Sequence, residues 1–432
     1  MLKRTLSSDH LALLQLIADE AVSHQMPLYI VGGFVRDLLL GLPGLDFDLV
    51  VEGDAVAFAR SISNKFGGKV TVHAHFGTAS WLLDTGDTAR SNVPSFENTN
   101  IPTLDFISAR SETYAHPGAL PTVKRGTLMD DLRRRDFTIN TLALRLDGEH
   151  YGQLEDDLGG LDDLTKGLVR VLHPGSYKDD PTRILRAIRY EQRYGFQIAP
   201  EDLDLIRGAK PILGGLSGER LRHELDLILA EERSALMLAR LNELDIRGAI
   251  HPLLAWEAYL SPLFESLNKP EPASWKGIPD LLHVPRRIAL GYLLWLGRLT
   301  ATAIEELASR LDFTAGLRDA LLAYSDLQAD LPALVEAKPS VVTTRLDKVP
   351  LLAICAASLA ANDPARILLQ KYLSDWRHVK VKTTGRDLIK RGFPPGPAYQ
   401  VILSRLRVAW LDGELKTNED ELILLDKLTK LV

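Results

Sequence analysis

Apolar residues recur at two different spacings along the first third of the chain. Alternation or short apolar runs, which are typical of strands, occur at 28–31, 46–51, 69–73, 78–83, 103–108 and 140–146. Helical spacing covers 35–40 and 54–66. Helices interleaved with strands predict a small mixed-sheet domain over residues 1–150.

Strand-like patterns fade after Val171. The rest of the chain reads as consecutive amphipathic helices broken by Pro and Gly, for example at 220–230, 235–244, 301–311 and 317–327. We place boundaries near 150, 235 and 375, which gives helical segments at 151–235, 236–375 and 376–432. The predicted fold class is therefore α+β, with a small mixed sheet first and all-helical segments after it.

Composition narrows the class of protein. The chain has 432 residues, 46% of them hydrophobic and 25% charged, as in ordinary multidomain globular proteins. Its single cysteine, Cys355, excludes an intrachain disulfide and a cysteine zinc site, and a reducing cytoplasm fits this usage. No run approaches 18 uncharged apolar residues, so we expect no membrane partner.

The charge is unevenly distributed. The formal net charge is −6, yet residues 377–407 hold eight Lys or Arg and one acidic residue. A basic block in an acidic protein favours contact with a phosphate backbone. The candidate RNA-binding residues within it are Lys382, Arg386, Lys390 and Arg391. A solvated helix face is the alternative.

Candidate chemistry begins where the strand at 28–31 runs into Gly32-Gly33 and a helix that carries Arg36. A glycine turn lets backbone N–H groups approach a triphosphate closely. Asp46 and Asp48 follow at positions i and i+2 of the next strand, so both carboxylates should face one side. Paired hard oxygen ligands suit Mg²⁺. An ordinary turn and a solvated strand end are the alternatives.

A third carboxylate candidate is Asp105, on a strand expected beside the first pair. Three converging carboxylates could hold two Mg²⁺ ions about 3.5–4 Å apart, one activating an RNA 3′-hydroxyl and one neutralising the leaving pyrophosphate. A solvent-facing strand aspartate is equally compatible. Downstream, Arg135 is a candidate phosphate contact and Asp136 a candidate acceptor for a ribose hydroxyl, although a solvated helix end would look the same.

The segment 179–189 carries an arginine stripe. Asp180 is expected as N-cap and Pro181 as first residue of a helix on which Arg183, Arg186 and Arg189 share one face. Aspartate accepts hydrogen bonds and arginine only donates them, which matches the donor–acceptor edge of cytosine and adenine. Against guanine or uracil two groups stay unpaired, which predicts rejection on the order of 10²–10⁴-fold. Such a pair selects bases without a nucleic-acid template.

Four motifs in order resemble those of class II tRNA nucleotidyltransferases, which comprise CCA-adding enzymes and related bacterial poly(A) polymerases of the DNA polymerase beta superfamily. They are Gly-Gly-Phe-Val-Arg-Asp with Asp-Phe-Asp (32–48), Arg-Arg-Asp-Phe-Thr-Ile-Asn (134–140), Asp-Pro-Thr-Arg-Ile-Leu-Arg-Ala-Ile-Arg (180–189) and Gly-Glu-Arg-Leu-Arg-His-Glu-Leu (218–225). The resemblance implies a catalytic head, neck, body and tail over the four segments above. It also implies CTP, ATP and the tRNA 3′ end as partners, without an obligate protein partner.

The resemblance further implies Mg²⁺ at Asp46 and Asp48, and a set of nucleotide contacts: Gly32, Gly33, Arg36, Arg135, Asp136, Asn140, Asp180, Arg183, Arg186 and Arg189. Two departures are Asp-Asp-Leu-Gly-Gly at 156–160, where the family often has Asp-Pro-Phe-Gly-Gly, and Asp179, where it often has Glu. Segment 110–121 resembles a variant of the flexible loop that influences the switch from C to A addition.

Alternatives within and outside this family stay open. An enzyme that adds only CC or only A would carry the same motifs. A poly(A) polymerase typically has a Gly-Arg-Arg-Phe-like segment where this chain has His-Phe-Gly-Thr at 75–78. An RNA-binding protein with an inactive head would not need the intact carboxylates.

Overall fold

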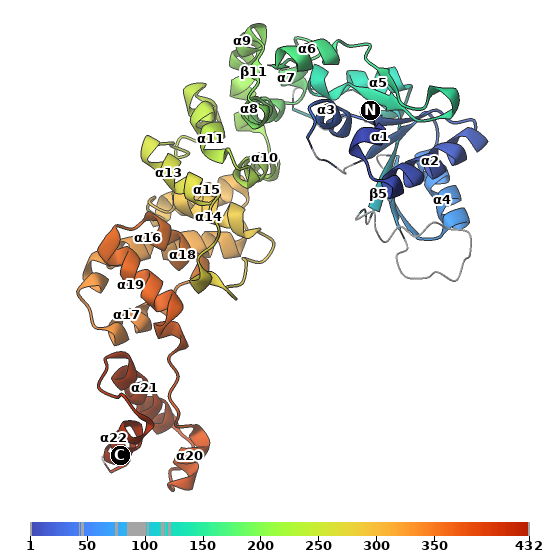
Figure 1. Cartoon of the computed structure of the whole chain (residues 1–432). Helices are drawn as coiled ribbons and strands as arrows, with labels where there is room; N and C mark the ends of the chain where they lie inside the picture. Colours follow the sequence, from blue (N-terminus) through green and yellow to red (C-terminus); the bar gives the residue numbers. More distant parts are fainter. Residues whose placement is uncertain are drawn as a thin grey trace. The chain divides into compact units, whose positions relative to one another are not determined.

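The computed structural model describes residues 2–42, 44, 47–73, 77–83, 101, 103–113, 116, 118–119 and 122–430. Asp46, and His75 and Phe76 of the segment at 75–78, lie outside the described residues. The chain forms two compact units, Met1–Leu216 and Ser217–Val432 (Figure 1). This division falls inside the predicted neck, and the four-part division stays a prediction.

The first unit contains a seven-stranded mixed sheet in the order β3-β4-β5-β2-β1-β8-β9. Only β2 and β5 pair in parallel; the other neighbours are antiparallel. The strands are β1 (Leu28–Val31), β2 (Asp48–Val51), β3 (Lys69–His73), β4 (Thr78–Leu82), β5 (Thr103–Ser108), β8 (Ala143–Arg145) and β9 (Gln153–Glu155). The predicted mixed-sheet head is confirmed.

Several predicted boundaries were wrong in detail. The strand expected at 140–146 is shortened to β8, because Thr138–Asn140 forms a 3-10 turn instead. The hairpin of β6 (Arg110–Thr113) and β7 (Thr122–Arg125) was missed, as was β9. These short strands carry mostly polar residues, so they lack the apolar alternation that reveals a strand.

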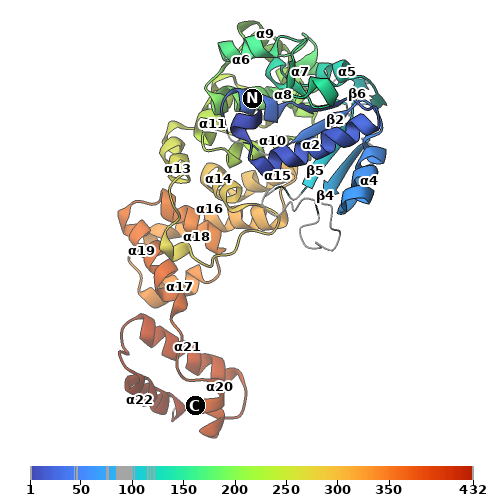
Figure 2. The same ribbon diagram turned by 45° about the vertical axis from the view of Figure 1, so that its right-hand side comes forward.

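Helices cover both faces of the sheet. The helices before residue 140 are α1 (Leu2–Thr5), α2 (Ser8–Ser23), α3 (Gly33–Leu39), α4 (Ala55–Phe66) and α5 (Leu128–Arg133). Phe58 of α4 packs edge-on against Phe106 of β5, with ring centres 5.4 Å apart, and α2 lies against α4 (Figure 2). On the opposite face, Leu128 and Leu132 of α5 join a core cluster with Val50. Asp48 shares the face of Val50, away from α4.

The rest of the first unit is mostly helical. It contains α6 (Gly160–Lys166), α7 (Ser176–Asp179), α8 (Arg183–Tyr194) and α9 (Pro200–Ala209). The all-helical prediction needs one correction, because β10 (Leu168–Val169) and β11 (Gln197–Ile198) form a short parallel pair. Such two-residue strands are too short to leave a periodic pattern in the sequence.

The second unit is built from helices, as predicted. They are α10 (Gly218–Ala230), α11 (Ser234–Glu243), α12 (Ile246–Ile250), α13 (Ser261–Ser266), α14 (Arg286–Leu296), α15 (Ala301–Leu311), α16 (Ala315–Val335), α17 (Pro339–Leu346), α18 (Leu351–Ala360), α19 (Asp363–Ser374), α20 (Gly385–Lys390), α21 (Pro397–Leu411) and α22 (Asn418–Thr429). None of the described helices is long and apolar enough to cross a membrane.

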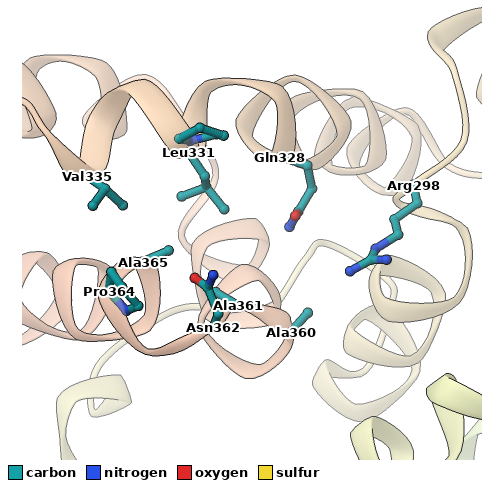
Figure 3. A pocket seen from close by; sticks show the side chains of 10 residues that line it. Arg298, Gln328, Leu331, Val335, Ala360, Ala361, Asn362, Pro364 and Ala365 are labelled. Atoms are coloured by element: carbon teal, nitrogen blue, oxygen red, sulfur yellow. The ribbon is translucent and has the colours of Figure 1, made fainter.

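A hollow of about 490 Å³ lies in this helical unit, between α16 and the corner where α18 meets α19 (Figure 3). Leu331 and Val335 line its apolar side, and Gln328 and Arg298 lie toward one end. The predicted site residues do not line it.

Candidate active site

The Gly-Gly turn lies at the end of the sheet where β2 begins. Ile30 pairs with Leu49, so Gly32 follows β1 at the edge that carries Asp48. Gly32 has a φ of +74°, and a Cβ there would lie 2.3 Å from an Nη1 atom of Arg135. Only glycine allows this backbone conformation together with this close approach. The predicted strand–glycine turn–helix unit is confirmed, and Arg135 is its immediate neighbour.

Two carboxylates share this edge. Asp48 and Asp105 are partners in the parallel register of β2 and β5, so they project from the same face. Ser80 of β4 donates a hydrogen bond of 2.5 Å to Asp105 Oδ1. Phe47 is buried beside Phe34, with ring centres 4.7 Å apart, and this packing anchors the residue just before Asp48. Within the described part of the chain, no group of three metal-ligating side chains comes together.

Arg36 is buried rather than open to solvent, with 3% of its surface exposed. Its Nε donates to Asp37 at 2.9 Å, and an Nη donates to the side-chain oxygen of Asn140. The guanidinium lies over the rings of Tyr190 and Tyr194, at 5.1 and 4.7 Å from their centres. Arg36 therefore ties α3 to α8.

The two tyrosines were missed by the sequence analysis. They lie four residues apart on α8, and the Tyr194 hydroxyl donates to Asp37 at 3.0 Å. The burial of this hydroxyl raises the pKa of Tyr194 to about 12, so it remains a donor at physiological pH. The spacing of two aromatic residues beside the arginine stripe was the available signal, since arginine stacks readily on aromatic rings.

Asp136 lies opposite the arginine stripe. Its Oδ2 accepts hydrogen bonds from Nε and Nη2 of Arg186 at 2.8 and 2.5 Å. Its Oδ1 accepts from Asn140 at 2.8 Å and from the Phe137 N–H at 2.9 Å. Burial by itself would raise the pKa of Asp136, but Arg186 and Asn140 outweigh it and bring the value down to about 2. Asp136 thus supplies the negative charge that offsets the repulsion among the arginines of the stripe.

Arg135 lies between the glycine turn and Asn140. It donates to the Asn140 carbonyl at 3.4 Å and to Asp131 at 3.1 Å. Its Nε is buried and has no hydrogen-bond partner among the residues that the structure describes. A buried guanidinium N–H without a partner is costly. The Nη1 atom of the same guanidinium is the one that lies against Gly32, and the side chain keeps 13% of its surface exposed.

The two residues predicted to select the base, Asp180 and Arg183, lie in a single turn. α8 begins at Arg183 with Thr182 as its N-cap residue, so the expectation of Asp180 as N-cap was wrong by two positions. The reason is α7, which ends at Asp179 and makes 180–182 a tight connection. Asp180 still caps locally, because its Oδ1 accepts from the N–H and hydroxyl of Thr182 at 3.1 and 2.7 Å.

Arg183 is almost fully buried, with 6% of its surface exposed. It donates to the Ser176 hydroxyl and, at 2.8 Å, to the Arg134 carbonyl. Arg189 is equally buried and lies over the Tyr190 ring at 5.6 Å. Hydrogen bonds in the first unit thus join Arg36, Arg135 and Asp136 to Asn140, and Asp136 to Arg186 on α8. Arg183 bonds to the carbonyl of Arg134, the residue before Arg135.

The predicted RNA-binding residues lie in the second unit. Lys382, Lys390 and Arg391 line one hollow of about 360 Å³. Arg391 forms an ion pair with Asp426, so part of its charge is compensated. Arg386 is exposed on α20. Glu421 fixes the segment at 382–383 by accepting both backbone N–H groups.

Comparison with known proteins decides the family. Residues 28–170 match the family described as the poly A polymerase head domain, and residues 195–257 match its probable RNA and SrmB-binding site. The A-adding tRNA nucleotidyltransferase of Halalkalibacterium halodurans is 34% identical over 98% of this chain and 93% of its own length. The chain belongs to this nucleotidyltransferase family. It is therefore an enzyme of the nucleotidyltransferase class.

Solved structures of the family agree in fold. A CCA-adding enzyme described as apo form II is 30% identical, with a TM-score of 0.81, and the match covers 100% of this chain and 98% of that one. The Thermotoga maritima CCA-adding enzyme complexed with tRNA is 29% identical, with a TM-score of 0.75, and the match covers 100% and 97%. Head, helical segments and tail segment all fall within these matches.

Proposed function

We propose that this nucleotidyltransferase extends the 3′ end of tRNA with C and/or A, using CTP and ATP without a nucleic-acid template. The observation that carries the proposal is the network in the first unit. Hydrogen bonds among Arg135, Asn140, Asp136 and Arg186 link the neighbour of the glycine turn to α8, and Arg183 bonds to the Arg134 carbonyl. The strand register places Asp48 at the same edge of the sheet as the glycine turn. The residues proposed to bind phosphate, to hold the metal and to select the base thus all lie in the first unit.

Mg²⁺ would be held by Asp48 together with Asp46, and Asp105 is the third candidate. The donor set fits, because Asp48 and Asp105 offer hard carboxylate oxygens from one face of the sheet. The metal, when bound, lowers the pKa of the attacking 3′-hydroxyl and neutralises the departing pyrophosphate. Arg135 would bind a phosphate oxygen, because its guanidinium lies against the glycine turn and is partly exposed. Cytoplasmic location stays a prediction.

Base selection would rest on Asp180 and Arg183. Cytosine and adenine present the same order of donor and acceptor, so this pair excludes G and U and does not by itself separate C from A. The A-adding relative that matches 98% of the chain favours addition of the terminal A. Addition of the whole CCA end is the second candidate, favoured by the CCA-adding enzymes of the same fold.

Transfer assays distinguish these candidates. Purified enzyme is given tRNAs that end before C74, before C75 or before A76, each with one nucleotide at a time and Mg²⁺. An A-adding enzyme extends only the tRNA that ends in CC, and only with ATP. A CCA-adding enzyme extends all three, and no transfer of C or A to any of them refutes the proposal.

Two substitutions test the assigned roles. Asp48→Asn should reduce transfer by at least about 10³-fold while tRNA affinity stays within about threefold, because the carboxylate acts on the reacting phosphate and not on RNA binding. Normal transfer by this variant would exclude the metal role. Lys390→Ala, in the tail segment, should weaken tRNA binding and leave the transfer rate at saturating tRNA unchanged.

A further inference from the structure

Ser176 is a fully buried polar residue that none of the predicted motifs includes. It is the first residue of α7 and has 0% of its surface exposed. A buried hydroxyl needs a specific reason to be there, because an apolar side chain of similar size would avoid the cost of removing it from water. Its contacts supply that reason.

The residue touches both members of the base-selecting pair. The Ser176 hydroxyl accepts a hydrogen bond from an Nη of Arg183. The Ser176 carbonyl accepts the backbone N–H of Asp180 at 3.2 Å, and its own N–H donates to the His173 carbonyl at 3.0 Å. A single residue therefore fixes the backbone that carries the acceptor and the side chain that carries the donor.

The two members of the pair need different degrees of support. Asp180 is short and already tied to the Thr182 N–H and hydroxyl within its own turn. Arg183 has a long side chain, and its hydrogen bonds in the described structure go to two acceptors only, Ser176 Oγ and the Arg134 carbonyl. The second acceptor is a backbone carbonyl, which a side-chain substitution does not remove. Ser176 is thus the side chain that accepts a hydrogen bond from this guanidinium in the part of the chain that the structure describes.

We propose that Ser176 is a positioning residue that sets base selectivity by holding the Arg183 guanidinium in the plane of the incoming base edge. The proposal rests on the proposed function. The Ser176 hydroxyl on α7 and the Arg134 carbonyl after α5 together hold the Arg183 side chain, which otherwise samples many rotamers. Discrimination between C or A and G or U depends on the donor lying within a fraction of an ångström of the base.

Selectivity should therefore fall more than activity when the hydroxyl is removed. In Ser176→Ala we expect kcat/KM for the correct nucleotide to fall by less than about fivefold. The ratio of correct to incorrect incorporation (A or C over G or U) should fall by about 10-fold or more, the size of one lost hydrogen bond to a charged group. The decrease in kcat/KM for the correct nucleotide should come mainly from a higher KM for that nucleotide, with a smaller change in kcat.

Three companion variants separate positioning from general structure. Ser176→Thr keeps the hydroxyl and should restore selectivity. Ser234→Ala is the matched control, because Ser234 is also fully buried and its hydroxyl has no partner in the described part of the chain. Arg183→Lys removes the fork that Ser176 holds, so adding Ser176→Ala to it should change the incorporation ratio no further.

The outcomes are distinct. If wild-type enzyme transfers neither C nor A to tRNA, the proposed function fails and Ser176 is not in question. If wild-type enzyme is selective and Ser176→Ala keeps the full ratio, the positioning role is refuted. An additive double variant with Arg183→Lys also refutes it. Should Ser176→Ala not fold, Ser176→Cys, with a weak acceptor at the same place, must show the reduced ratio.

Discussion

The ion pair between Asp136 and Arg186 gives the sharpest quantitative prediction. Asp136→Asn keeps the size of the side chain and an oxygen for the Phe137 N–H, but it removes the charge that Arg186 faces through two hydrogen bonds. The Asp136 side chain is 8% exposed and that of Arg186 is 30% exposed. The remaining guanidinium would lie half-buried beside a neutral amide.

The magnitude follows from the pKa of Asp136. Its environment, in which Arg186 and Asn140 outweigh burial, lowers the pKa from 3.8 to about 2. At 1.36 kcal/mol per pKa unit, the ionised carboxylate contributes about 2 kcal/mol to folding stability. Because the folded pKa is depressed, this contribution is complete above about pH 4 and is lost as the pH falls toward 2.

A double-mutant cycle with Asp136→Asn and Arg186→Gln measures this coupling. Urea unfolding is followed by hydrogen exchange of amides in the first unit, because the two units need not unfold together. We expect Asp136→Asn alone to cost about 2 kcal/mol at pH 7. The coupling with Arg186 should clearly exceed that of an exposed ion pair at pH 7 and weaken as the pH approaches 2. The matched control is the exposed pair Asp162–Lys166, whose coupling should stay below about 0.5 kcal/mol. A coupling at pH 7 no larger than this control would refute the reasoning.

Three further predictions concern other parts of the molecule. Gly32→Ala should destabilise the first unit by about 1–2 kcal/mol, measured by thermal unfolding, because φ is +74° and the new Cβ would meet Arg135; a neutral effect contradicts this. Tyr194→Phe keeps the ring under Arg36 and should weaken nucleotide binding less than Tyr194→Leu does, by titration calorimetry; equal losses would exclude the ring contact. Glu421→Gln should increase hydrogen exchange at 382–383, whose N–H groups the carboxylate accepts; unchanged exchange would exclude that anchor.

Much of the site was accessible from the sequence because its chemistry is local. The turn at Gly32, the strand that begins at Asp48 and the helix at 183–194 each follow from residues adjacent in the chain. A strand that carries Asp105 beside the strand of Asp48 was also expected, whereas its parallel direction and its register came from the structure. Helical positions such as 220–230 were predictable because amphipathic spacing is a strong signal over ten or more residues.

Long-range contacts decided the roles of individual charges. The sequence by itself determined that three arginines share a helix face. Only the tertiary structure decided that Arg183 bonds to Ser176, that Arg186 faces Asp136 and that Arg36 is buried between two tyrosines. Periodicity specifies which side of an element an amino acid occupies, because that depends on backbone geometry alone. Which residue lies opposite that side depends on how distant segments pack. A charged side chain pairs with the polar groups that this packing places within hydrogen-bond distance.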